Sequence, residues 1–181
     1  MYQPLKRCLS LVVLALCSLA LTACLNSDKS LMDANTRVLP FTPPITIEVY
    51  ERENPKDPWR KQKDLVTLVA DNQLVVRVKD GESGDTYTFH PLEPRRFMVE
   101  AWSKSSGRFT YGVLEMRNGE GILHHLLCEN VDEAAFKAAG GIVTGINFKE
   151  CNMDKISNPL AFVNALAAKP TGSQQRYVPV R

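Results

Sequence analysis

The stretch FTYGVLEMRNGEGILHHLLC, residues 109–128, decides the fold. Residues 109–116 and 122–128 are both rich in apolar side chains, and the tetrapeptide Asn118-Gly119-Glu120-Gly121 separates them. An Asn-Gly pair between two such runs is the strongest short-range indication of a β-hairpin, because both residues tolerate the positive φ angles of a tight turn. The sequence therefore predicts a pair of antiparallel strands here.

Short runs with strand character recur upstream of this hairpin. In residues 45–49 apolar and polar side chains alternate, which is the pattern of a strand with one buried face. The turn residues Asp71-Asn72-Gln73 separate two further runs, and residues 81–84 form another turn. The predicted upstream strands are residues 45–49, 66–69, 74–78, 86–89 and 95–102.

Downstream of the hairpin, two short segments carry helix-capping residues. Asn130 can cap a helix over residues 131–139, and Asn158 can cap a second helix over residues 159–167. Strands followed by helices indicate an α+β domain. We therefore expect, over residues 45–169, a small antiparallel β-meander covered by two short C-terminal helices.

The N-terminus has the parts of a secretory signal. Lys6 and Arg7 supply positive charge, residues 9–20 form an apolar stretch, and small residues precede Cys24. The sequence Leu21-Thr22-Ala23-Cys24 resembles the lipobox of bacterial lipoproteins, which signal peptidase II cleaves before the cysteine. A simple cleaved secretory signal is the alternative.

The resemblance implies a removed signal peptide over residues 1–23 and a lipid anchor on Cys24. In this family the cysteine sulfur carries a diacylglyceryl group and the freed amine a third acyl chain, and two or more chains hold a protein stably on a membrane. Asp after the cysteine usually means retention at the inner membrane, whereas this chain has Leu25. The resemblance therefore implies the periplasmic face of the outer membrane.

Both ends of the mature chain are expected to be unpacked. Residues 24–44 start with Ser, Asp and Asn residues and end in PFTPP, which favours extended backbone, so they are predicted to be a lipid anchor and flexible tether. Residues 170–181 are predicted to be a disordered tail. The alternative for the tail is docking through Tyr177, Val178 and Val180, onto a surface or as a strand added to a partner.

The excess of positive charge in the chain belongs to the signal. There are 22 Lys and Arg against 20 Asp and Glu, and two of the basic residues, Lys6 and Arg7, precede the cleavage site. The mature chain is therefore formally neutral. This balance argues against a nucleic-acid partner, because such proteins need clustered positive charge.

Two cysteines remain for the folded domain. Two earlier cysteines leave with the signal and Cys24 carries lipid, whereas Cys128 and Cys151 form an even pair in an oxidising compartment. We predict a disulfide between them, which stabilises the fold by about 3 kcal/mol in the chain-entropy description. The alternative makes one of them a catalytic thiol beside His124 or His125.

Motifs for catalysis, cofactors and metals are sparse. The sequence has no phosphate-binding loop, dinucleotide fingerprint or HExxH motif. His124 and His125 are adjacent in a predicted strand, so their rings point to opposite faces and cannot share one metal ion. No catalytic residue, cofactor or metal ligand is therefore predicted.

Two basic clusters are the candidate contacts for a partner. Trp59 lies beside Arg60 in a long charged loop, and an exposed Trp next to cations is typical of an interface anchor or a headgroup contact. Arg95 and Arg96 precede an apolar run and can grip a carboxylate or phosphate. The alternatives are Trp59 as a lid on the core and the arginines as a solvated strand end.

These features favour a non-catalytic interaction or binding module, anchored in the outer membrane, whose partner is an unidentified envelope protein. One alternative is a periplasmic carrier that holds a small ligand or lipid between the sheet and the helices. A second alternative is a hydrolase that uses His124 or His125 with a Ser or Cys nucleophile.

Overall fold

A computed structural model describes residues 25–41, 46–70, 73–78, 83–145, 149–167 and 173–180. Within these residues eleven strands form one sheet. Its main body has eight strands: β2 (Thr46–Arg52), β3 (Arg60–Ala70), β4 (Gln73–Val78), β5 (Ser83–Glu93), β6 (Arg96–Ser103), β7 (Arg108–Arg117), β8 (Glu120–His125) and β11 (Gln174–Val180). The other elements are β1 (Leu25–Ser27), β9 (Ile142–Thr144), β10 (Glu150–Asn152), the α-helices α2 (Glu133–Ala138) and α3 (Pro159–Ala167), and the 3-10 helices η1 (Ala34–Thr36) and η2 (Cys128–Asn130).

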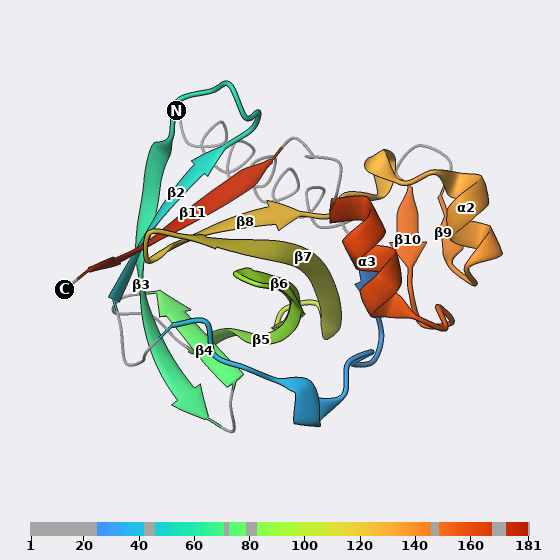
Figure 1. The fold of residues 1–181 in the computed structure, drawn as a ribbon, viewed down its shortest axis with the longest axis horizontal. Coiled ribbons are helices and arrows are strands. Elements are labelled where there is room, and N and C mark those ends of the chain that lie inside the picture. The colour runs from blue at the N-terminus through green and yellow to red at the C-terminus, as the bar shows by residue number, and fades with distance from the viewer. Residues whose placement is uncertain are drawn as a thin grey trace, which may run out of the picture.

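The eight strands of the main body close into a barrel (Figure 1). From β2 to β8 each strand pairs antiparallel with the next one along the chain. The last strand, β11, pairs with both β8 and β2. Closure gives each of these strands a hydrogen-bonded neighbour on both sides and removes the exposed edges of an open sheet.

The expectation of a disordered tail over residues 170–181 is wrong for residues 174–180, which form β11. In this strand Gln174 pairs with Arg52 of β2 and with His124 of β8. The physical reason is that the meander from β2 to β8 leaves two edges open, and a strand placed between them satisfies both. The residues of the tail therefore add a strand to the chain's own sheet, and not to a partner as the alternative had it.

The predicted hairpin of residues 109–128 is present as β7 and β8. Arg117 pairs with Glu120, which leaves Asn118 and Gly119 as a two-residue turn with φ angles of 53° and 84°. Both values suit the type I′ turn that an Asn-Gly pair favours. The register that follows places Leu114 directly opposite Leu123.

Apolar side chains from alternate positions of β5 to β8 pack together inside the barrel. Phe89, Val99, Leu114 and Leu123, from β5 to β8, are buried together. Partly buried side chains pack around them: Val38, Phe41, Tyr87, Phe97, Met116 and Tyr177. An eight-stranded barrel is narrow enough for side chains to fill it, and this one has a packed interior core.

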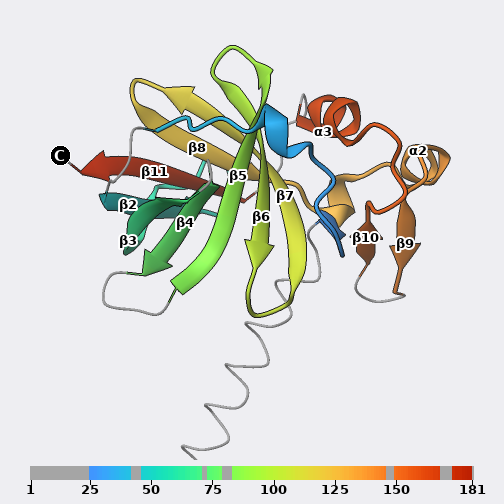
Figure 2. The same ribbon diagram turned by 90° about the horizontal axis from the view of Figure 1, so that it is seen from below.

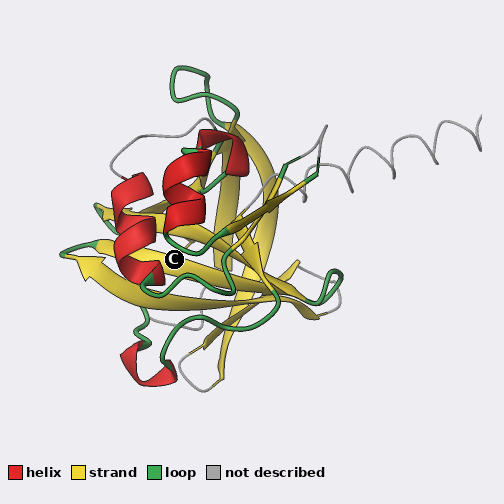
Figure 3. Ribbon diagram, turned by 90° about the vertical axis from the view of Figure 1, so that its right-hand side faces the viewer, coloured by secondary structure: helices red, strands yellow, loops and turns green. Residues whose placement is uncertain are grey.

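A second core lies outside the barrel, against β6 and β7. The two α-helices and the strands β9 and β10 gather on this side, in front of the barrel strands in Figure 3. The predicted disulfide Cys128–Cys151 is confirmed and lies in this core, with 5.4 Å between the two Cα atoms. Other buried members are Leu25, Met98, Tyr111, Val113, Leu126, Phe136, Met153, Ile156 and Val163.

The predicted fold class, a small α+β meander covered by two helices, is wrong. The structure is mostly strand, and its sheet is mixed because β1 pairs parallel to β10. The physical reason is that a long twisted meander can curl until its ends meet, so the sheet buries its own apolar face. The short helices α2 and α3 cover only part of the outer wall.

The caps of the helices agree in part with expectation. Asn158 accepts a hydrogen bond from the backbone N–H of Ala161 at 3.0 Å and caps α3 as predicted. Asp132, not Asn130, caps α2, by accepting a hydrogen bond from the N–H of Ala135 at 2.9 Å. The residues before Asp132 form η2 instead, so the helix begins later than the sequence indicated.

Residues 25–41, called the strap below, run from the second core, outside the barrel, to the core inside it, which Val38 and Phe41 contact (Figure 2, blue). Leu25 is fully buried, and its backbone N–H donates to the carbonyl oxygen of Leu126 at 3.0 Å. The flexible tether predicted over residues 24–44 is therefore wrong for the strap, because its apolar side chains find partners in both cores: Leu25, Leu31, Met32, Val38 and Phe41. The predicted signal and anchor at residues 1–24 lie outside the described residues, as do residues 42–45.

Candidate functional site

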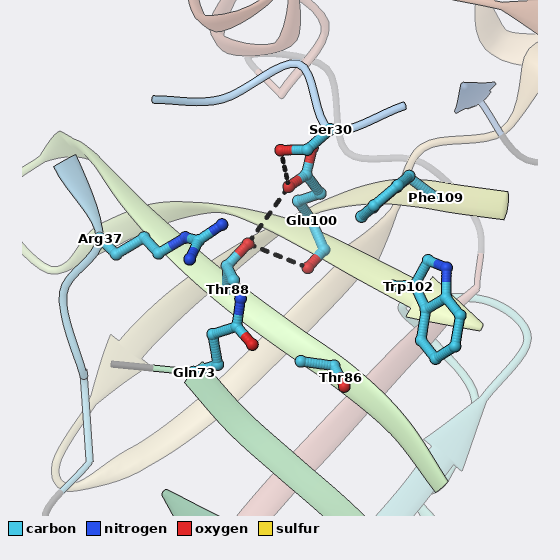
Figure 4. Close-up of a pocket in the computed structure, with 8 residues that line it drawn as sticks. All are labelled: Ser30, Arg37, Gln73, Thr86, Thr88, Glu100, Trp102 and Phe109. Carbon is cyan, nitrogen blue, oxygen red and sulfur yellow. Dashed lines mark hydrogen bonds between the residues drawn. The ribbon is translucent and has the colours of Figure 1, made fainter. Parts of the chain in front are cut away.

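A cavity of about 250 Å³ lies between the strap and the outer wall of the barrel (Figure 4). Strap residues form one side, and outward-facing residues of β4 to β7 form the other. The lining residues are Ser30, Arg37, Gln73, Thr86, Thr88, Glu100, Trp102 and Phe109. They combine one cation, one carboxylate, uncharged polar groups and two aromatic rings, which is the mixture that small-molecule sites use to orient a ligand.

Strand register builds the barrel side of the cavity. Tyr87 and Phe89 pack in the barrel interior, so Thr86 and Thr88, which alternate with them, face outward. Cross-strand pairing then sets two rows side by side on β5, β6 and β7: Thr86, Trp102 and Phe109 in one, and Thr88, Glu100 and Tyr111 in the other. The first row is mainly aromatic, and the second carries a carboxylate between hydroxyl groups.

Glu100 fastens the strap to the barrel wall. Its side chain is 1% exposed, and one carboxylate oxygen accepts from the Ser30 hydroxyl at 2.8 Å while the other accepts from the backbone N–H of Leu31 at 2.9 Å. From the barrel side, the hydroxyls of Tyr111 and Thr88 donate at 3.2 and 3.4 Å. A buried carboxylate is costly unless hydrogen bonds replace its water, and here donors from both sides do so.

The hydroxyl group of Tyr111 stays protonated in this network. Burial, followed by the adjacent negative charge of Glu100, raises the pKa of Tyr111 far above its ordinary value. The same hydroxyl also hydrogen-bonds the Ser27 hydroxyl of the strap. The group therefore acts as a fixed link between strap and wall.

His90 continues the network beside the cavity as a neutral imidazole. It is fully buried, with Nδ1 2.8 Å from the hydroxyl of Thr36 and Nε2 3.4 Å from that of Thr88. Burial lowers the pKa of His90 to about 4, and the positive charge of Arg37 adds to this effect. The Nδ1 contact with Thr36 holds η1 against β5, and the Nε2 contact with Thr88 lies within β5.

Arg37 is the lining residue whose polar atoms are least satisfied. Its Nε–H is buried and has no hydrogen-bond partner among the described residues, and its guanidinium forms no ion pair within that part of the chain. In Figure 4 it lies on the side of the cavity opposite Trp102 and Phe109, with Glu100 and Thr88 between. A guanidinium has five N–H donors and no acceptor, so it can hold an acceptor group of a ligand.

Trp59 and Arg60, the first predicted partner contacts, lie where the chain enters β3. The guanidinium of Arg52 stacks over the Trp59 ring at 4.2 Å from its centroid and also donates to the carbonyl oxygen of Pro55 at 2.6 Å. Arg60 is exposed and borders a smaller cavity of about 170 Å³, together with Glu51 and other charged residues of this loop. Trp59 thus packs against a cation on the outside of the barrel.

Arg95 and Arg96, the second predicted cluster, lie in the turn between β5 and β6. Arg95 is exposed and has a φ angle of 63°. Arg96 forms ion pairs with Glu93 at 2.9 Å and with Glu115 of β7 at 3.8 Å. The two arginines therefore differ, since one projects from a turn and the other lies against the barrel wall.

A row of side-chain contacts connects the two predicted clusters across the outer wall. Nε of Arg52 donates to the side-chain oxygen of Gln174 on β11 at 2.7 Å. The side-chain nitrogen of Gln174 lies 3.0 Å from Nδ1 of His124. Nε2 of His124 lies 3.8 Å from Glu115, the partner of Arg96. We call this set the outer-wall row; its members are Trp59, Arg52, Gln174, His124, Glu115 and Arg96.

The adjacent histidines have different surroundings. His124 contacts the outer-wall row, whereas His125 hydrogen-bonds Gln175, the next residue along β11. Burial lowers the pKa of both histidines. Because Cys128 and Cys151 are bonded to each other, neither offers a thiolate to a histidine base, and the thiol form of the hydrolase alternative lacks its nucleophile.

The described part of the chain contains no group of three or more His, Cys, Asp or Glu residues placed to hold a metal ion. None of the helices described is long and apolar enough to cross a membrane. No family model, no curated protein and no solved structure matches this chain.

Sequence reasoning missed the cavity residues. Arg37 was assigned to a flexible tether, and Thr86, Glu100 and Trp102 lay in runs that were read only as strands. One indication was present: Glu100 interrupts the run from Phe97 to Trp102, and a carboxylate amid apolar strand residues needs a specific set of donors. Those donors come partly from the strap, which only the tertiary structure brings to it.

Proposed function

We propose that this chain is a non-catalytic binding module of the cell envelope, held at the periplasmic face of the outer membrane through lipid on Cys24. Its binding site is the cavity between the strap and the barrel. The observation that carries the proposal is the lining itself, in which Arg37 and two aromatic rings face each other across a space of about 250 Å³.

The hydrogen bonding around the cavity favours binding over reaction. A general base must reach a proton of the substrate. The oxygens of Glu100 already accept four hydrogen bonds, and both ring nitrogens of His90 lie against protein hydroxyls. These two groups hold the walls in place, and Arg37 and Trp102 are left to contact a ligand.

The cavity also favours a small polar ligand over a lipid. Among the side chains that the structure describes, Phe89 and Leu114 pack in the barrel interior on the side of β5 to β8, and the layer between the barrel and the helices is a second packed core. Acyl chains need a deep apolar cavity, whereas this cavity has Arg, Glu, Gln, Ser and Thr in its lining. A small-ligand carrier is therefore closer to our proposal than a lipid carrier.

Native mass spectrometry of the full chain, isolated from its own envelope, tests the proposal. We expect a bound small molecule in the wild type, and its loss in Thr86→Trp, which fills the cavity. Thr46→Trp on β2, far from the lining, is the matched control and should retain the molecule. Identical spectra for the three proteins, all folded, would refute the cavity as the site.

A protein partner on the outer wall is a second candidate function. The observation that favours it is the stack of Arg52 on Trp59 at one end of the outer-wall row, because Trp and Arg are residue types that dominate binding energy at interfaces. A photo-crosslinking residue at Arg60 leaves the Trp59–Arg52 stack intact. One dominant crosslinked protein in cells, absent with the probe at Lys137 on α2, would support this candidate, and its absence would remove it.

A further inference from the structure

We infer that the cavity takes a small cyclic carboxylate, of the size of a single sugar-acid ring, with the carboxylate on Arg37 and the ring face on Trp102. The inference rests on the proposed function and goes beyond it by naming the ligand class. Three features of the lining support it. Arg37 is a cation available to a ligand, the carboxylate of Glu100 already has its hydrogen bonds, and Trp102 and Phe109 form an aromatic wall on the side opposite Arg37.

Arg37 provides the anion-binding group. No hydrogen bond or ion pair engages its terminal N–H groups within the described chain, so a ligand that supplies an acceptor there gains a hydrogen bond without displacing a protein partner. The planar fork of a guanidinium matches the two oxygens of a carboxylate and forms paired, charge-assisted hydrogen bonds. A neutral acceptor would satisfy one N–H but would leave the positive charge uncompensated.

Glu100 limits the charge of the ligand. Its four hydrogen bonds come from uncharged donors, and no ion pair joins it to Arg37 within the described residues. The lining therefore presents one positive charge next to a buried negative one. A monoanion balances Arg37, whereas a dianionic phosphate would add repulsion from the Glu100 carboxylate.

Trp102 and Phe109 provide the surface for a ring. They are paired across β6 and β7 and lie together on the side of the cavity away from Arg37 (Figure 4). The face of an aromatic ring carries partial negative charge and attracts the C–H groups of a flat ring that stacks on it. Thr86 and, on the side of Arg37, Gln73 also line the cavity and offer hydroxyl and amide groups to ring substituents.

The volume suits a ligand of one ring. The cavity of about 250 Å³ is smaller than the 300–1,000 Å³ (roughly) typical of sites for drug-sized molecules. It corresponds to about eight water molecules at the density of the liquid. A six-membered ring with one carboxylate and a few hydroxyl groups is of this scale, and an oligosaccharide is not.

Calorimetric titration of the purified full chain in detergent tests the inference with three probes: glucuronate, glucose and acetate. Glucuronate has both the ring and the carboxylate, glucose has the ring alone, and acetate has the carboxylate alone. We expect glucuronate to bind at least about tenfold more tightly than either, because hydrogen bonds to charged groups contribute about one to two powers of ten in affinity.

Variants of Arg37 assign the charge contribution. Arg37→Gln should lose about tenfold to a hundredfold of the glucuronate affinity and none of the glucose affinity, and Arg37→Lys should lose less. Arg95→Gln, in an exposed turn outside the cavity, is the matched control and should bind like the wild type. Trp102→Leu should weaken glucuronate and glucose alike and leave acetate unchanged, and it serves as the second variant if Arg37→Gln fails to fold.

The results separate this inference from the proposed function. Equal affinity for glucose and glucuronate, or glucuronate binding that survives Arg37→Gln, would overturn the carboxylate assignment. If native mass spectrometry shows a molecule that Thr86→Trp removes and glucuronate does not displace, the cavity is a binding site and the inferred ligand class is wrong. If no molecule is retained by the wild type and no probe binds, both proposals fail.

Discussion

Acidification from pH 7 to pH 5 is expected to destabilise the fold through His90. In the folded protein burial lowers the pKa of His90 from 6.5 to about 4, so between these values the unfolded chain binds a proton that the folded protein does not. The contribution of His90 to the free energy of unfolding is therefore at its full value above pH 6.5, and it falls as the pH decreases towards 4. By pH 5 the loss relative to pH 7 is about 2 kcal/mol, or about thirtyfold in the folding equilibrium.

Urea unfolding at pH 7 and pH 5 measures this loss. With a slope of about 1–3 kcal/mol per molar urea, the midpoint of the wild type should fall by about 1 M. His90→Asn removes the titrating group and should reduce that pH-dependent shift. The shift that remains comes from His124 and His125, whose pKa values burial also lowers.

The comparison between the two pH values isolates the titration from packing. His90→Asn leaves a gap in a fully buried site, and that cost is the same at pH 7 and pH 5. If wild type and variant lose equal stability on acidification, the buried imidazole takes up its proton without penalty. The reasoning from burial would then be refuted.

Three further predictions concern the parts that hold the fold together. Glu100→Gln should lower the melting temperature by about 2–10 °C, because the N–H groups of the new amide would face the hydroxyl and N–H donors that now surround the carboxylate. An unchanged melting temperature in thermal melts would show that the strap does not depend on this charge. Replacing both Cys128 and Cys151 by Ser should cost about 3 kcal/mol in urea unfolding, since their disulfide closes a loop over a sequence separation of 23 residues; a cost near zero would contradict the loop-closure account. Deletion of residues 174–181 should open the barrel between β2 and β8 and abolish cooperative unfolding; a sharp transition in the truncated chain would mean that β11 is dispensable.

Local features of the fold were predictable where neighbouring residues decide them. The turn at Asn118 and Gly119 follows from the tolerance of these residues for positive φ, and it alone sets the register of β7 against β8. The Asn158 cap of α3 has the same local origin. The disulfide was predictable from the number of cysteines that follow the predicted signal, which does not depend on the fold.

Closure of the barrel was not predictable in this way. In residues 174–180, Tyr177, Val178 and Val180 allow a strand, but nothing in the composition places that strand between β8 and β2. Their pairing depends on edges that exist only after seven other strands have assembled. The predicted helical cover failed for the same reason, since a sheet that curls shut buries its own apolar face and leaves the helices on the outside.

For the cavity, too, the sequence determined only local features, and the tertiary structure brought them together. The sequence by itself determined the outward row of Thr86, Trp102 and Phe109 only as strand positions, and it placed Arg37 in an extended segment. The tertiary structure decided that the strap lies across β5 to β7, held by Glu100, and that Arg37 faces two aromatic rings. Alternation along a strand and the conformation of a turn are properties of adjacent residues, whereas a site between two distant segments depends on long-range packing, which a single sequence pattern does not encode.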